Sequence, residues 1–179
     1  MNLAVFKEGN AHFNGSVYRC SLGRTGIKQN KFEGDGASPS GTYALLEVMY
    51  RKDRHKPPKT KLPCTQIEKT SGWCDAPEDP AYNRPVSIPY QASFEALYRD
   101  DELYDFVVVT SHNSNPVKSG AGSAIFLHVT RAPEYPPTEG CIAFAVTDLL
   151  EIISLWQPQK DRLVIGEPTE SDIAIEWKR

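Results

Sequence analysis

Cys141 and His128 together indicate catalysis by a cysteine nucleophile. The chain reads PPTEGCIAFA from Pro136 to Ala145, so Gly140 directly precedes the cysteine. A thiol needs a base to become a nucleophilic thiolate at neutral pH, and a nearby imidazole is the usual base. His128 lies thirteen positions earlier, and closing a loop of that size costs only a few kcal/mol. Together they predict a cysteine nucleophile with a histidine base.

Each of these residues also has a structural interpretation. Alone, His128 is typical of a satisfied interior histidine on a sheet face, and Cys141 of a small buried hydrophobic residue. Two further classes of protein stay open. A binding module would result if the two side chains lay too far apart to couple. A redox or thiol sensor would use Cys141 alone, but no obvious resolving cysteine lies near it.

The elements around this pair are two strands and a helix. The stretch SAIFLHVT alternates so that Ala124, Phe126 and His128 share one face, and DFVVVTS forms a strand before it. TDLLEIISLW carries a Leu/Ile stripe, with Thr147 as the expected N-cap and Pro158 as the stop. We therefore expect Cys141 where a loop turns into a helix.

The rest of the chain is rich in strands and turns. Asn14-Gly15 predicts a hairpin, residues 43–50 a strand, and DRLVIGE a last strand. Residues 51–89 show little periodicity, but their aromatic residues favour an ordered, substrate-facing excursion. Helical spacing follows at Phe94, Leu97 and Tyr98. The chain is expected to form one domain, residues 1–179, mainly β with few helices.

Composition excludes several classes. With 20 Lys+Arg against 23 Asp+Glu, the net charge of −3 predicts no nucleic-acid partner, and no apolar run approaches the roughly 20 residues of a membrane span. Four cysteines show no CxxC pair and no zinc spacing, so neither a metal nor another cofactor is expected. No secretory signal is recognised at the N-terminus, which predicts a cytoplasmic protein, or a periplasmic one if the sequence is trimmed.

The segment IFLHVTRAPEYPPTEGCIAFAVTDLL resembles the active-site segment of the L,D-transpeptidase catalytic domain, the YkuD family. KFEGDGASPSGTYALLEV, WCDAPEDPAYNRPV and LYDFVVVTSHNSNPVKSGAGSAIFLHV agree with it. The resemblance implies a β-sandwich catalytic domain with Cys141 as nucleophile and His128 as base. It also implies that the Val129 carbonyl holds the imidazole and that the backbone N–H groups of Gly140 and Cys141 form the oxyanion hole.

Two positions depart from the family pattern. Glu139 stands where a second histidine is common, and Ala143 stands where an arginine is common two positions after the cysteine. Other side chains are therefore expected to bind the substrate. Arginine forks suit the carboxylates of a peptide stem, and the candidates for substrate binding are Arg131, Arg84, His112, Asn113 and Tyr82.

The resemblance implies acyl transfer on peptidoglycan stem peptides. The thiolate would attack the meso-diaminopimelate carbonyl that is linked to D-alanine, and D-alanine would leave. With water as acceptor the enzyme is an L,D-carboxypeptidase of soluble muropeptides in cytoplasmic cell-wall recycling, the expectation favoured here. The alternatives are a periplasmic L,D-transpeptidase that forms cross-links or exchanges D-amino acids, and a non-catalytic muropeptide-binding module. A monomer is expected.

Overall fold

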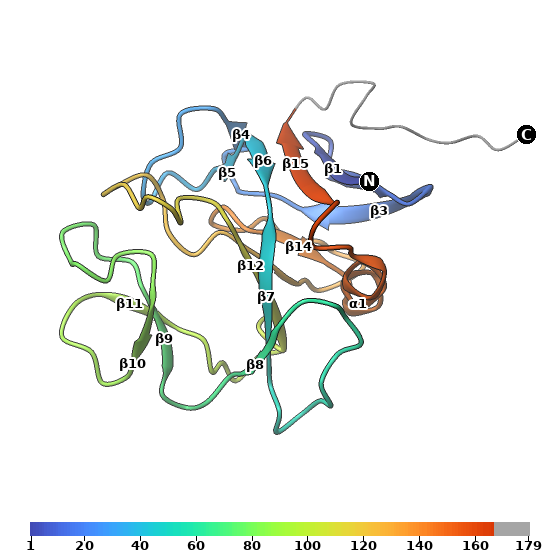
Figure 1. The fold of residues 1–179 in the computed structure, drawn as a ribbon. Helices are drawn as coiled ribbons and strands as arrows, with labels where there is room; N and C mark the ends of the chain where they lie inside the picture. The colour runs from blue at the N-terminus through green and yellow to red at the C-terminus, as the bar shows by residue number, and fades with distance from the viewer. Residues whose placement is uncertain (167–179) are drawn as a thin grey trace, which may run out of the picture.

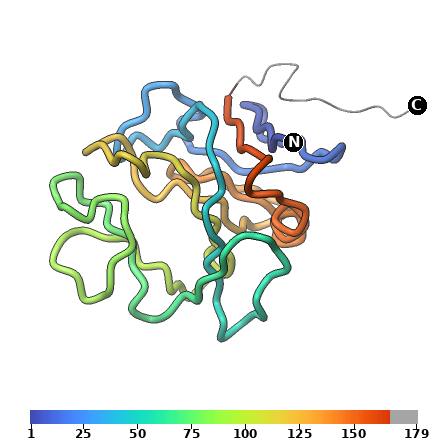
Figure 2. The backbone as a smooth tube through the Cα atoms, viewed as in Figure 1, coloured from blue at the N-terminus to red at the C-terminus, as the bar shows by residue number. Residues whose placement is uncertain are grey.

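The computed structural model describes residues 1–166, whose path is drawn in Figures 1 and 2. These residues form fifteen strands and one helix, α1 (Val146–Leu155). In chain order the strands are β1 (Asn2–Phe6), β2 (Asn10–Phe13), β3 (Ser16–Ser21), β4 (Ile27–Lys28), β5 (Ser38–Pro39), β6 (Gly41–Tyr43), β7 (Leu45–Tyr50), β8 (Cys64–Gln66), β9 (Ser71–Cys74), β10 (Pro85–Ser87), β11 (Phe94–Ala96), β12 (Phe106–Thr110), β13 (Phe126–Val129), β14 (Ile142–Phe144) and β15 (Arg162–Gly166). The prediction of a mainly β fold with few helices is confirmed.

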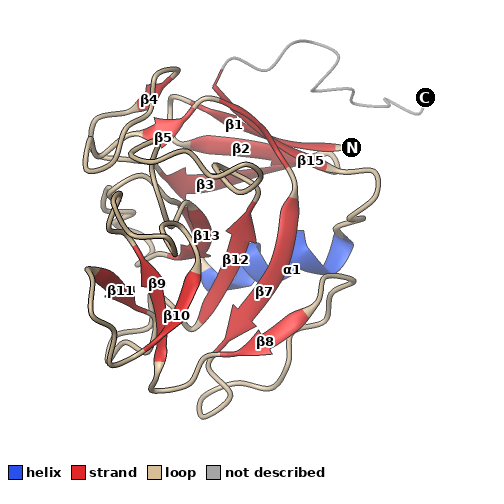
Figure 3. Cartoon of the chain, turned by 60° about the vertical axis from the view of Figure 1, so that its left-hand side comes forward, coloured by secondary structure: helices blue, strands red, loops and turns tan. Residues whose placement is uncertain are grey.

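Ten strands form one curled sheet, in the order β6-β15-β1-β2-β3-β14-β13-β12-β7-β8. Figure 3 shows the half around β1, β2, β3 and β15 turned relative to the half around β7 and β12, with α1 against the sheet. Buried apolar residues from both halves and from α1 form one core, which includes Leu3, Phe13, Val48 and Trp156. The two halves therefore face each other across a shared core, as in a sandwich.

The central strand β13 supplies residues to both faces of this sheet. Leu127 and Val129 belong to the core under α1. Phe126 belongs to a second buried cluster, which also contains Cys141 and Trp73. Because neighbouring residues of a strand point to opposite faces, the alternation predicted for this stretch is confirmed.

A separate three-stranded sheet, β10-β9-β11, covers the second cluster and lies to one side of β12 and β13 (Figure 3). Two of its strands, β9 and β10, come from residues 51–89, the excursion expected to be ordered. Trp73 and Tyr82 are buried there, and the Tyr90 hydroxyl donates to the Asp79 carboxylate at 2.7 Å. The prediction of an ordered excursion is confirmed.

The hairpin predicted at Asn14-Gly15 joins β2 to β3. Both residues have positive φ, 50° and 80°, and two positive φ angles are what a type I′ turn requires. In residues 1–166, no helix is long and apolar enough to cross a membrane.

Two local predictions are wrong. The helix expected at 94–98 is instead β11, which pairs with β9, and Leu97 continues that pairing with a backbone bond to Ser71 at 3.0 Å. Tertiary pairing outweighs propensity in so short a segment. Helix α1 starts at Val146 with Ala145 as N-cap and no side-chain cap. Thr147 lies inside the helix and donates to Asp148, so it is not the cap.

Candidate active site

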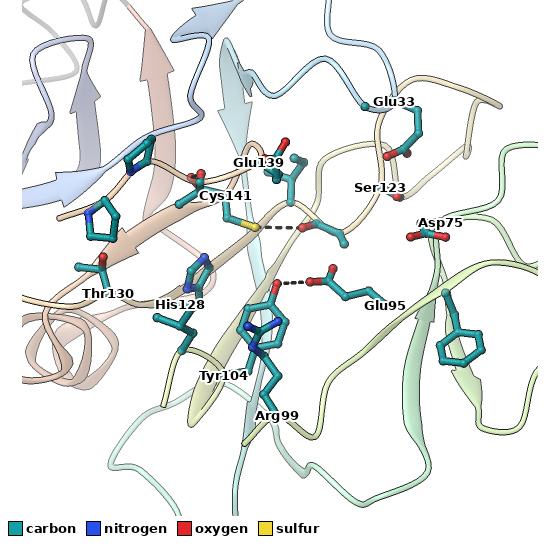
Figure 4. A pocket seen from close by; sticks show the side chains of 18 of the residues that line it. Glu33, Asp75, Glu95, Arg99, Tyr104, Ser123, His128, Thr130, Glu139 and Cys141 are labelled. Carbon is teal, nitrogen blue, oxygen red and sulfur yellow. Dashed lines mark hydrogen bonds between the residues drawn. The ribbon is translucent and has the colours of Figure 1, made fainter. Parts of the chain in front are cut away.

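Parallel pairing of β13 with β14 brings His128 and Cys141 together. Leu127 pairs with Ile142 and His128 with Ala143, which places Cys141 beside Phe126, two residues from His128 on the same face. Cys141 therefore precedes a strand, and the expectation of a helix start at this position is wrong. Both side chains line one pocket of about 610 Å³, and they face its interior in Figure 4.

The His128 ring is fixed in one tautomer. Its Nδ1 lies 2.8 Å from the Val129 carbonyl oxygen, and a carbonyl can only accept, so Nδ1 carries the proton and Nε2 keeps a lone pair. This is the contact that the family resemblance implies. The ring also meets Tyr104 edge to face, with 5.2 Å between the ring centroids. His128 is thus oriented as a base.

Backbone groups hold the Cys141 sulfur in place. The thiol donates to the Ala124 carbonyl at 3.1 Å and accepts the Phe126 N–H at 3.4 Å. Ala124 has a φ of 51°, a left-handed conformation that is uncommon for a residue with a side chain. Among the described residues, no hydrogen bond joins the thiol to the His128 ring. The thiol proton is directed at Ala124 in this state.

Both groups are neutral at neutral pH. Burial raises the pKa of the Cys141 thiol to about 12, and the negative charge of Glu95 adds to this rise. Burial lowers the pKa of His128 to about 4. A thiolate–imidazolium pair is therefore not the resting state, because burial disfavours both charged forms.

Gly140 is required by its surroundings. Its φ is 145°, and a Cβ at this position would lie 2.7 Å from the Ala37 carbonyl oxygen. That contact is with backbone and cannot be relieved by a rotamer change. The glycine-rich stretch around Ala37 is thus a structural turn against which the Gly-Cys segment packs.

The expected oxyanion hole is only partly available. The Gly140 N–H donates to the Thr138 hydroxyl at 3.1 Å, and that hydroxyl donates to the Cys141 carbonyl at 2.6 Å. The assignment of the Gly140 N–H as an oxyanion donor therefore does not fit this conformation. The Cys141 N–H has no acceptor within residues 1–166 and is free to receive an oxyanion.

None of the five residues expected to bind substrate lines this pocket. His112 and Asn113 bond to backbone carbonyls of the neighbouring loop, at 3.0 Å to Ala121 and to Gly122 respectively. Arg131 is exposed, and Arg84 donates to a backbone carbonyl at 2.7 Å outside the pocket. None of these four side chains lines the pocket in this conformation, and their role in substrate binding stays a prediction.

Tyr82, the fifth candidate, lies behind a residue that lines the pocket. It is buried, and its hydroxyl donates to Glu33 at 2.5 Å and accepts the Gly122 N–H at 3.0 Å. Glu33 does line the pocket. Tyr82 therefore supports a pocket residue and does not itself line the pocket.

Two residues that shape the site are not among the sequence-based candidates: Tyr104, which lines the pocket, and Asn83, which lies behind it. Tyr104 lies beneath His128 and donates its hydroxyl to Glu95 at 2.5 Å. Buried Asn83 accepts from the Ala124 N–H at 3.0 Å and the Trp73 indole at 2.9 Å, and so holds the Ala124 segment. Both residues lie in stretches that agree with the family resemblance, Asn83 in WCDAPEDPAYNRPV and Tyr104 in LYDFVVVTS, and that agreement is the sequence signal that could have found them.

One family of known proteins matches nearly the whole length of this chain. The family model of the L,D-transpeptidase catalytic domain, YkuD, matches residues 2–165. No curated protein matches the chain. Among solved structures, it is similar to the helical cell shape determining protein Pgp2 from Campylobacter jejuni, at 15% identity and a TM-score of 0.46, over 94% of this chain and 48% of that one.

A second similar structure is L,D-transpeptidase 3 from Mycobacterium tuberculosis in complex with a faropenem-derived adduct. It has 14% identity and a TM-score of 0.42, and the match covers 93% of this chain and 60% of that one. The chain thus spans about half the length of the first protein and three-fifths of the second. The family match covers nearly all of the described residues, and this chain belongs to the YkuD family of L,D-transpeptidase catalytic domains.

Proposed function

We propose that this protein is a cysteine-dependent acyl-transfer enzyme that cleaves the bond between meso-diaminopimelate and D-alanine in peptidoglycan tetrapeptide stems. The observation that carries the proposal is the His128 tautomer. With Nδ1–H fixed on the Val129 carbonyl, Nε2 is the ring atom left to take a proton, and it shares a pocket with the Cys141 thiol.

The neutral resting state determines the first step. Because the thiol is protonated and the imidazole is neutral, His128 Nε2 takes the thiol proton as the sulfur attacks the peptide carbonyl. The carbonyl oxygen becomes an oxyanion, and the free Cys141 N–H is placed to stabilise it. The thiol must first turn from the Ala124 carbonyl, as often happens when substrate tightens an active site.

The second half of the reaction regenerates the thiol. The imidazolium gives its proton to the D-alanine nitrogen, the C–N bond breaks and a thioester remains on Cys141. Neutral His128 then takes a proton from water, whose oxygen attacks the thioester. The C–S bond breaks, the sulfur recovers a proton from the imidazolium, and the tripeptide leaves with a new carboxylate.

Hydrolysis is the outcome we favour, with soluble muropeptides as substrate in cytoplasmic recycling. A pocket of about 610 Å³ accommodates the end of one stem, and water needs no second peptide site. The family match supports transpeptidation as the second candidate, in which an amine of another stem replaces water at the thioester.

Incubation of the protein with disaccharide tetrapeptide, followed by mass spectrometry, tests this proposal. Release of D-alanine with tripeptide as the sole other product is the expected result, and Cys141→Ala should abolish it. Cys20→Ala is the matched control, because Cys20 is also a buried free thiol but lies outside this pocket. Dimers or exchanged D-amino acids would indicate transpeptidation. Binding without turnover would indicate a binding module.

A further inference from the structure

The charges that line the pocket fall into two groups. Six ionisable Lys, Arg, Asp and Glu side chains line it: Lys31, Glu33, Asp75, Glu95, Arg99 and Glu139. Three of these are in ion pairs, namely Lys31 with Asp35 at 2.5 Å, Arg99 with Asp101 at 2.6 Å and Glu139 with Arg24 at 3.0 Å. Both cations of the lining are therefore already neutralised by a partner carboxylate.

Glu33, Asp75 and Glu95 have no ion-pair partner within residues 1–166. Asp75 Oδ1 is also fully buried and has no hydrogen-bond partner there. Burial raises the pKa of Glu95, and the charges of Asp75 and Glu33 raise it further, while the Tyr104 hydrogen bond and the Arg99 charge lower it. The unpaired charge of the pocket is thus negative, and its members repel one another.

Glu95 is the member nearest to the chemistry. Its Oε1 accepts the Tyr104 hydroxyl at 2.5 Å, and the Tyr104 ring packs against His128. Its second oxygen, Oε2, accepts no hydrogen bond from the described residues. Figure 4 shows its carboxylate at Tyr104, on the same side of the pocket as Asp75 and across from Cys141. One oxygen is thus anchored and the other is left for a ligand.

The pocket is suited to an organic cation. The described residues contain no group of three or more His, Cys, Asp or Glu side chains placed to hold a metal ion. An ammonium group needs no such convergence, because each of its N–H bonds can reach a different acceptor. A charge-assisted bond to a desolvated carboxylate is among the stronger polar contacts in proteins.

We propose that Glu95, anchored by Tyr104, binds the side-chain ammonium of the diamino acid whose carbonyl Cys141 attacks, with Asp75 and Glu33 completing a negative wall. This inference rests on the proposed function, in which that residue is meso-diaminopimelate. It makes Glu95 a specificity-determining residue: stems with a free side-chain amine at this position bind, and neutral analogues bind poorly.

The test measures binding and needs no turnover. The Cys141→Ala protein is titrated in a calorimeter with L-alanyl-γ-D-glutamyl-meso-diaminopimelyl-D-alanine and with an analogue that has a hydroxyl in place of the side-chain amine. Hydrogen bonds to charged groups predict about 10- to 100-fold weaker binding of the hydroxyl analogue. In the Cys141→Ala/Glu95→Gln protein, the ratio of the two dissociation constants, hydroxyl analogue over amine peptide, should shrink to about threefold or less.

Glu139→Gln in the same Cys141→Ala background is the matched control. Glu139 lines the same pocket, but its charge is already paired with Arg24, so the ratio should stay as in the parent. Glu95→Gln preserves an acceptor for Tyr104, and an unchanged melting temperature confirms that it folds. An equal ratio with and without Glu95→Gln, or no discrimination in the parent, overturns the inference.

The two proposals fail separately. If the protein with Cys141 intact releases D-alanine from both peptides at equal rates and the parent binds them equally, the inference fails and the proposed function stands. If it releases no D-alanine although the binding ratio depends on Glu95, the proposed function fails and the ammonium site stands.

Discussion

The two walls of the active-site pocket differ in charge. One wall is the ten-stranded sheet, where β13 supplies His128, Cys141 directly precedes β14, and backbone groups fix each side chain. The other wall comes from the three-stranded sheet and its neighbourhood, where β11 supplies Glu95 and the residue after β9 is Asp75. The first wall is desolvated and neutral, and the second carries unpaired negative charge.

This difference separates reactivity from recognition. Burial keeps the thiol and the imidazole uncharged, so the proton moves from Cys141 to His128 only when substrate is bound. The facing wall has charge that a substrate can neutralise. Substitutions confined to one wall should therefore change either reactivity or recognition.

On the reactive wall, His128→Asn should lower kcat/KM by at least about 100-fold, because a general base contributes that much or more. Steady-state D-alanine release measures the effect. His12→Asn is the control, since His12 lies on β2, away from the pocket, and should leave the rate unchanged. A similar loss in both variants would show that the effect is not due to the base.

Gly140→Ala should destabilise the fold by about 2–4 kcal/mol, because the new Cβ meets the Ala37 carbonyl and the residue must keep a positive φ. Urea unfolding measures the loss. Gly26→Ala is the matched control: its φ is 83°, but nothing lies within 4 Å of its Cβ. A loss of about 1 kcal/mol of unfolding free energy in Gly26→Ala would give the cost of the positive φ alone, without a clash. Equal losses of stability in Gly140→Ala and Gly26→Ala would contradict the close contact between Gly140 and the Ala37 carbonyl.

The pH profile reports the neutral resting state. The active form of His128 is unprotonated, and burial lowers its pKa to about 4, so kcat/KM should hold down to about pH 5. It should then fall about tenfold per pH unit below about pH 4. An acid limb near the ordinary histidine pKa of about 6.5 would mean that His128 is solvated or paired with a charge.

On the charged wall, Glu95→Gln should make Cys141 a few-fold more reactive to iodoacetamide at pH 8 to 9. The Glu95 charge raises the pKa of the thiol, second to burial, so its removal lowers that pKa and increases the thiolate fraction. Burial remains, which keeps the change small. An unchanged or slower alkylation rate would show that Glu95 does not reach the thiol electrostatically.

Most of the reactive wall can be predicted from the sequence. Alternation along SAIFLHVT placed His128 correctly, and loop length allowed Cys141 to return to it. The strand that follows Cys141 cannot be predicted from the sequence, because helix α1 begins only five residues after Cys141 and its periodic signal obscures the short strand β14. Three apolar residues fit either state, and pairing with β13 decides between them.

The charged wall cannot be predicted from the sequence. Glu95 lies in a segment with helical spacing, and it reaches the pocket only because β11 pairs with β9. Arg84 and Arg131 are predicted to bind the carboxylates of a stem peptide, but neither lines the pocket, whose unpaired charges have the opposite sign. Which side chains remain without a partner is a property of tertiary contacts and leaves no local pattern.

The most direct test of the central claim is to trap the acyl-enzyme. The protein is mixed with tetrapeptide, quenched in acid within its first turnovers, and digested for mass spectrometry. We expect a tripeptidyl thioester on Cys141, absent from Cys20, Cys64 and Cys74, and lost on treatment with hydroxylamine. Turnover without any adduct on Cys141, or an adduct confined to another cysteine, would contradict it.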